Sequence, residues 1–277
     1  MRKIFVNEDW MLELKHQSGE PKIIRIKGQE ISRDNFTMIA GPCTIENYED
    51  LLSIAVHLKE SGIKYLRGGA YKLRTSPYSF RGLGQEGLRY LKQVATETGL
   101  ISVSEIVACE DVETMSEYVD ILQVGTRNMH NYRLLWKLGK VKNPVILKRG
   151  MSSTIEEWLL AAEHILEAGN PNVILCERGI RTFENYTRYT LDISAIPAVK
   201  NLSNLPIIVD PSHSSGRREM IKSLSWAAMA AGADGLLIET HFNPDATVCD
   251  SRQTIDFKIL EEILAEKEPL LALWGKK

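Results

Sequence analysis

The feature that most constrains this fold is a regular alternation of short apolar runs and amphipathic segments, which begins at about residue 36. The apolar runs are rich in Ile, Val and Leu, so they predict strands that are buried on both faces. The segments between them carry apolar residues at helical spacing. The predicted strands are 36–40, 64–68, 101–106, 121–125, 145–149, 173–177, 206–210 and 235–239. The predicted helices are 48–60, 85–98, 111–118, 132–138, 154–168, 191–200, 217–231 and 254–265.

Eight strand-then-helix units predict an α/β fold, a (β/α)8 TIM barrel, with an open doubly wound sheet as the alternative. Two β-like runs, residues 3–6 and 23–27, precede the barrel and predict a short N-terminal β-hairpin extension that closes its bottom. We expect one barrel domain over residues 1–277, with the extension at 1–35 and the barrel core at 36–265. The glycines expected to end helices in the left-handed conformation are Gly62, Gly99, Gly139, Gly169 and Gly232.

The overall charge suggests neither a nucleic-acid nor a membrane partner, because 34 basic residues nearly balance 36 acidic ones. The four cysteines are widely spread and form no C-x-x-C pair, which favours free thiols over a disulfide framework. No segment resembles a signal peptide or a membrane helix of about 18 apolar residues. These observations predict a cytoplasmic protein.

Basic side chains gather at the predicted C-terminal ends of four strands, where barrel enzymes place their active sites. Taken singly, most Lys and Arg side chains are simply solvated. Six cations at one barrel mouth would repel one another unless anions were bound there, and Arg suits bidentate contacts to phosphate or carboxylate. The sequence therefore predicts a pocket for polyanionic ligands. The residues are Arg67, Lys72, Arg74, Arg127, Lys148 and Arg178.

A second group of side chains, at the ends of strands one, seven and eight, has the composition of a metal site. Cys43, His213, Glu239 and Asp250 offer a thiolate, an imidazole and two carboxylates, a mixed set that suits a divalent first-row ion. Alone, Cys43 could be a small buried hydrophobic residue and His213 a structural loop histidine. The two carboxylates at the barrel mouth favour the metal site, because they need a nearby cation.

Seven motifs in these regions carry a family resemblance. They are GPCTIE, RGGAYKLRTSPYSFRGLG, LQVGTRNMHNY, LKRG, ILCERGIRTFE, VDPSHSSGRR and ADGLLIETHFNPDATVCD. In this order they resemble the 3-deoxy-D-arabino-heptulosonate-7-phosphate (DAHP) synthases, type I beta branch, from about residue 36 to residue 264.

The resemblance implies a transferase, a 3-deoxy-7-phosphoheptulonate synthase. Such an enzyme joins phosphoenolpyruvate, erythrose 4-phosphate and water into DAHP and phosphate, the first step of the shikimate pathway of aromatic amino acid biosynthesis. It also implies a homodimer or homotetramer. Beyond the barrel we see no room for an added regulatory domain, so we expect no built-in feedback inhibition.

The resemblance also assigns roles to residues of this chain. A divalent ion (Mn, Fe, Co, Zn or similar) is expected on Cys43, His213, Glu239 and Asp250. The expected phosphoenolpyruvate ligands are Arg67, Lys72, Arg127, Lys148 and Arg178. Contacts to erythrose 4-phosphate are expected from Arg74, Thr75 and Ser76. The predicted catalytic residues are Lys148 as a proton donor, Glu105 near the attacking water, and the metal ligands Cys43 and His213.

Three other functions stay open. A 3-deoxy-D-manno-octulosonate-8-phosphate synthase would use arabinose 5-phosphate, but its usual K-A-N-R-S loop carries an Asn that is missing between Leu73 and Arg74. A Schiff-base aldolase would use Lys148 as its nucleophile. A non-catalytic binding paralogue is hinted at by Leu73, which stands where the family usually has Pro.

The sequence departs from the family pattern at a second position, Tyr189, where the family more commonly has Asn.

Overall fold

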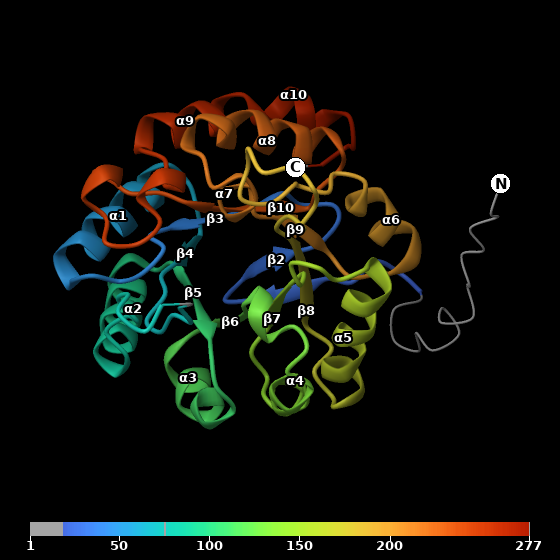
Figure 1. Cartoon of the computed structure of the whole chain (residues 1–277), viewed down its shortest axis with the longest axis horizontal. Helices are drawn as coiled ribbons and strands as arrows, with labels where there is room; N and C mark the ends of the chain where they lie inside the picture. Colours follow the sequence, from blue (N-terminus) through green and yellow to red (C-terminus); the bar gives the residue numbers. More distant parts are fainter. Residues whose placement is uncertain (1–18, 75, 277) are drawn as a thin grey trace.

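The computed structural model, which describes residues 19–74 and 76–276, is a closed barrel of eight parallel strands. Strands follow one another around the barrel in chain order, and β10 closes it by pairing with both β3 and β9. Helices form a ring outside the strands (Figure 1). The (β/α)8 prediction is confirmed, and the open-sheet alternative is wrong. In the described part of the chain, no helix has both the length and the apolar character needed to cross a bilayer.

The boundaries of the elements follow the predicted alternation closely. The strands are β1 (Ile24–Ile26), β2 (Gln29–Ile31), β3 (Thr37–Gly41), β4 (Tyr65–Arg67), β5 (Ile101–Ile106), β6 (Ile121–Val124), β7 (Val145–Lys148), β8 (Val173–Glu177), β9 (Ile207–Val209) and β10 (Gly235–Glu239). The helices are α1 (Tyr48–Glu60), α2 (Gln85–Thr98), α3 (Val112–Tyr118), α4 (Tyr132–Leu138), α5 (Ile155–Glu167), α6 (Ala195–Leu202), α7 (Pro211–Ser215), α8 (Arg218–Ala230), α9 (Phe257–Ala265) and α10 (Lys267–Ala272). Neither α7 nor α10 was predicted.

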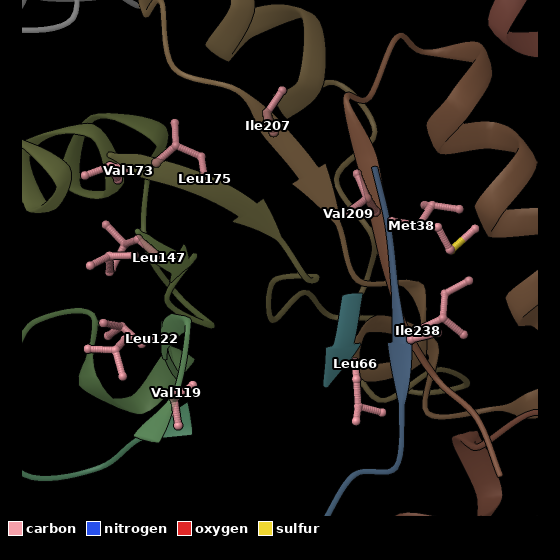
Figure 2. Close-up of a cluster of buried hydrophobic side chains, with 14 of the residues drawn as sticks. Met38, Leu66, Val119, Leu122, Leu147, Val173, Leu175, Ile207, Val209 and Ile238 are labelled. Carbon is pink, nitrogen blue, oxygen red and sulfur yellow. The ribbon is translucent and has the colours of Figure 1, made fainter. Parts of the chain in front are cut away.

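The larger hydrophobic core lies between the barrel and its helices. Outward-facing strand residues such as Met38, Leu66, Leu147 and Ile238 contribute to it, and Figure 2 shows part of this cluster. Trp158 on α5 is fully buried in the same core, and its indole N–H donates to the carbonyl oxygen of Leu147 at 3.1 Å. Successive strand residues face opposite sides, so the alternate residues point into the barrel.

A second cluster fills the interior of the barrel toward the N-terminal ends of its strands, and the N-terminal hairpin packs onto it. Its members are Ile24, Ile31, Ile39, Tyr65, Ile101, Val103, Ile121, Ile146, Ile174, Cys176, Ile208 and Leu237. Because Ile24 on β1 and Ile31 on β2 are completely buried in this cluster, the hairpin covers the N-terminal end of the barrel. Only the C-terminal end remains available for a site built from the strand ends.

Three local predictions need correction. The hairpin forms between β1 and β2, turning through Lys27 and Gly28, which both have positive φ; residues 3–6, its predicted first strand, lie outside the described residues. Gly139 does not adopt the left-handed conformation (φ −66°); a Cβ there would collide with Ala168, so close helix packing requires the glycine. Helix α6 begins at Ala195 rather than 191, because the Asp192 carboxylate accepts from the Ala195 amide and pairs with Arg149.

The hairpin should contribute measurably to stability through Ile24. Replacing Ile24 by Ala removes fully buried apolar volume and should lower the free energy of unfolding by about 2 to 5 kcal/mol. Its neighbour Ile23 is 38% exposed, so Ile23→Ala should change stability by no more than about 0.5 kcal/mol. Urea unfolding followed by circular dichroism measures both. Equal effects of the two substitutions would show that the hairpin does not cover the barrel in solution.

Candidate active site

The candidate site is built from side chains that lie two residues beyond members of the inner barrel cluster. Because side chains alternate along a strand, each of these residues points toward the barrel axis, above the apolar layer. The pairs of cluster member and site residue are Tyr65 and Arg67, Val103 and Glu105, Ile146 and Lys148, Cys176 and Arg178, Ile208 and Asp210, and Leu237 and Glu239. Arg149 has the opposite orientation, and its guanidinium pairs with Glu177 and Asp192.

A cavity of about 270 Å³ opens at this end of the barrel. The predicted residues that line it are Lys72, Arg74, Ser76, Glu105, Arg127, Lys148, Arg178, His213 and Asp250. Gly125 also lines it, and a Cβ there would collide with the Glu105 carboxylate, so the glycine makes room for that side chain. Cys43, Arg67 and Glu239 are buried next to the cavity, whereas Thr75 lies outside the described residues.

The four predicted metal ligands come together. One ligand atom from each of Cys43, His213, Glu239 and Asp250 lies within 4.8 Å of the others. The Cys43 Sγ is 3.1 Å from Asp250 Oδ2, and the His213 Nε2 is 3.2 Å from Glu239 Oε1. Burial raises the pKa of the Cys43 thiol well above its ordinary value, so its thiolate needs a cation close by. A mixed sulfur, nitrogen and oxygen set at this spacing fits a divalent transition-metal ion.

Asp210, which is not among the predicted site residues, orients His213. Its Oδ2 lies 2.7 Å from His213 Nδ1, and its Oδ1 accepts from the His213 amide at 2.8 Å. This leaves Nε2 facing Glu239. Burial lowers the pKa of His213, despite the opposing effect of Asp210, so the imidazole is favoured in the neutral form that a metal ligand requires.

Several of the predicted cations are already paired with carboxylates. Arg67 donates to Glu239 at 3.1 Å, Lys72 to Asp250 at 2.6 Å, and Lys148 contacts Asp210. Lys72 also contacts the Cys43 Sγ. The prediction that all six cations would repel one another without a bound anion is therefore wrong for these three, because Glu239, Asp250 and Asp210 supply the neutralising charges within the protein.

Arg178 is the cation whose surroundings most clearly favour a bound anion. It is 2% exposed and lines the cavity. Its Nη2 donates to the His213 carbonyl oxygen at 3.2 Å, while Nε and Nη1 have no hydrogen-bond partner among residues 19–74 and 76–276. Buried donors normally have partners, so these two are suited to an anionic ligand.

Other residues of the site were missed or left without a role. Gln253 donates from Nε2 to Glu239 Oε2 at 2.6 Å, and Arg188 donates to Gln253 at 3.1 Å. Cys249 is buried, and a hydrogen bond with Cys43 lowers its pKa to about 6. The spacing of residues in the sequence does not predict these contacts. Asp210, in contrast, could have been predicted from its position at a strand end.

Comparison with known proteins places this site in a family. The model of the DAHP synthetase I family matches residues 19–271. A phospho-2-dehydro-3-deoxyheptonate aldolase of Thermotoga maritima is 50% identical over 93% of this chain and 76% of its own length. A 2-dehydro-3-deoxyphosphooctonate aldolase of Syntrophotalea carbinolica is 32% identical over 83% of this chain and 88% of its own length.

Solved structures agree with this assignment. The crystal structure of a DAHP synthase from Thermotoga maritima has a TM-score of 0.90 and 49% identity, and the match covers 93% of this chain and 76% of that one. A truncated form of the 3-deoxy-D-arabino-heptulosonate 7-phosphate synthase of that organism has a TM-score of 0.87 and 46% identity, over 93% of this chain and 95% of that one. The chain therefore belongs to the DAHP synthetase I family.

Proposed function

We propose that this chain is a metal-dependent DAHP synthase that condenses phosphoenolpyruvate with erythrose 4-phosphate and water, giving DAHP and phosphate as the first step of the shikimate pathway. The observation that carries the proposal is one cavity that joins a four-residue ligand cluster to a buried arginine with two unpaired donors. The family resemblance implies a homodimer or homotetramer, and we also propose a place in the cytoplasm.

Cys43, His213, Glu239 and Asp250 would hold the divalent ion. Their four ligand atoms are close enough to share one ion, and Asp210 fixes the ring of His213 in the way that carboxylates commonly orient metal-binding histidines. When bound, the ion supplies Lewis-acid polarisation of the aldehyde oxygen. Mn, Fe, Co and Zn all suit such a donor set.

The cations around the cavity would bind the two substrates. Arg67, Lys72, Arg127, Lys148 and Arg178 are assigned to phosphoenolpyruvate; Arg67 would act from its buried position beside Cys43 and Glu239. Arg74 and Ser76, with Thr75, are assigned to erythrose 4-phosphate. Cationic clamps hold C3 of phosphoenolpyruvate against the aldehyde carbon and offset the repulsion between the two phosphorylated molecules.

Lys148 is proposed as the proton donor. Its ammonium contacts the buried carboxylate of Asp210, and Lys148 also lines the cavity. As C3 attacks the aldehyde carbon, the new hydroxyl needs a proton; water then adds at C2 and phosphate leaves. Glu105, which faces the same cavity, is placed to orient or deprotonate that water.

Erythrose 4-phosphate is favoured over arabinose 5-phosphate by the short loop in which Arg74 directly follows Leu73. The relatives agree, since the named heptonate aldolase is 50% identical and the named octonate aldolase 32% identical. A phosphate-release assay with phosphoenolpyruvate and each aldose tests this choice. We expect turnover with erythrose 4-phosphate and its loss in a chelator; faster turnover with arabinose 5-phosphate would establish the alternative, and none with either aldose would favour a binding paralogue.

Removing one ligand should strongly weaken metal binding and abolish turnover. Cys43→Ala should weaken Co²⁺ binding by more than about a hundredfold, because it removes a direct ligand. Cys109→Ala is the matched control, since Cys109 is half-buried outside the ligand cluster. Equilibrium dialysis of Co²⁺ measures the affinity, and a coupled assay measures the rate. Unchanged Co²⁺ binding by Cys43→Ala would contradict the assigned site.

Lys148 should act without forming a covalent bond to substrate. Its Nζ forms an ion pair with the buried Asp210 carboxylate, and an ammonium in an ion pair is not a nucleophile. Borohydride treatment in the presence of each substrate should therefore leave the protein mass unchanged by mass spectrometry. A reduced adduct on Lys148 would establish the Schiff-base aldolase mechanism instead.

A further inference from the structure

The segment that follows β8 brings Tyr189 to the edge of the active-site cavity. Its backbone is tied to α7, the short helix that carries His213: the amide of Tyr189 donates to the Ser214 carbonyl at 2.8 Å, and that of Arg188 to Ser215 at 2.9 Å. Thr190 exchanges two backbone hydrogen bonds of 2.9 Å with Ile180, which anchors the segment to the end of β8. Tyr189 thus has a fixed position relative to the ligand cluster.

The ring of Tyr189 lies against the guanidinium of Arg178. The Arg178 Cζ is 4.1 Å from the ring centroid, and the Arg188 Cζ is 5.8 Å from it. Both Tyr189 and Arg178 line the cavity. A cation this close to an aromatic face is attracted by the negative charge of the ring face, most strongly where water is excluded.

Arg178 differs from the neighbouring site cations in how it is held. Arg67, Lys72 and Lys148 each have a carboxylate partner, whereas Arg178 forms no ion pair within the described ranges 19–74 and 76–276. A carboxylate would neutralise the guanidinium and occupy its donors. An aromatic face stabilises the buried cation while leaving the in-plane N–H groups free.

We propose that Tyr189 is a positioning residue, whose ring holds the Arg178 guanidinium toward phosphoenolpyruvate and so sets the affinity for that substrate. The inference rests on the proposed function, which assigns phosphoenolpyruvate to Arg178. It also gives a role to a tyrosine at a position where the family more commonly has asparagine.

The test is direct binding of phosphoenolpyruvate to the Mn²⁺-loaded protein by isothermal titration calorimetry, with steady-state KM values for both substrates. Tyr189→Leu should weaken binding on the order of tenfold, as expected for a desolvated cation–π contact. The KM for phosphoenolpyruvate should rise by a similar factor, while kcat and the KM for erythrose 4-phosphate stay within about twofold. Tyr189→Phe keeps the ring but removes the hydroxyl, which also interacts with Arg178, so it should bind phosphoenolpyruvate clearly more tightly than Tyr189→Leu.

Tyr186→Leu is the matched control. Tyr186 lies on the same segment and stacks on Arg217 at 3.9 Å, but it does not line the active-site cavity, so phosphoenolpyruvate binding should be unchanged. If Tyr189→Leu does not fold, as judged by thermal unfolding, Tyr189→Asn is the second ring-free variant with the same expected loss.

Each outcome decides a different claim. Wild-type protein that fails to bind phosphoenolpyruvate contradicts the proposed function itself. Wild-type binding with an equally tight Tyr189→Leu variant overturns the role of Tyr189 alone. Equal increases of both KM values, or a Phe variant as weak as the Leu variant, would also overturn it, because neither result depends on the ring face beside Arg178.

Discussion

Pairing of buried carboxylates with cations from neighbouring strands is the constraint on which this barrel mouth depends. An unpaired buried charge costs several kcal/mol, so each buried carboxylate at the strand ends needs a partner. The pairs are Glu239 with Arg67, Asp210 with Lys148, Glu177 with Arg149, and Asp250 with Lys72. Because these pairs join residues from different strands and loops, they fix the site side chains by contacts within the protein.

The same pairing leaves two groups of side chains with different chemistry at the barrel mouth. On one side the Cys43 thiol and the carboxylates of Asp250 and Glu239 form a cluster that suits a metal ion, with Lys72 as a local counter-charge. On the other side Arg178 is held by the Tyr189 ring and keeps two donors unpaired. His213 joins the two groups, since its ring belongs to the cluster and its carbonyl oxygen accepts from Arg178. Under the proposed function, the two substrates would meet between these two groups of side chains.

The inward direction of the site side chains at the strand ends was predictable from the sequence, because successive side chains of a strand point to opposite faces. Ile146 in the inner cluster implies that Lys148 points inward, and one residue farther Arg149 must point outward. The hydrogen-bond partners could not be predicted from the sequence, because they join residues far apart in the chain. Gln253 and Glu239, on either side of the loop after β10, are an example. The β2 strand was missed because Gln29–Ile31 has only one apolar residue, which is buried solely by packing on the barrel.

The central claim is that one cavity holds a divalent ion on four named ligands beside an anionic substrate. A crystal structure with Mn²⁺ and phosphoenolpyruvate, with anomalous differences recorded for the metal, tests it most directly. The account predicts a single strong anomalous peak between Cys43 Sγ, His213 Nε2, Glu239 and Asp250, with the substrate on the free donors of Arg178. An anomalous peak elsewhere, or phosphoenolpyruvate bound away from Arg178, would contradict it.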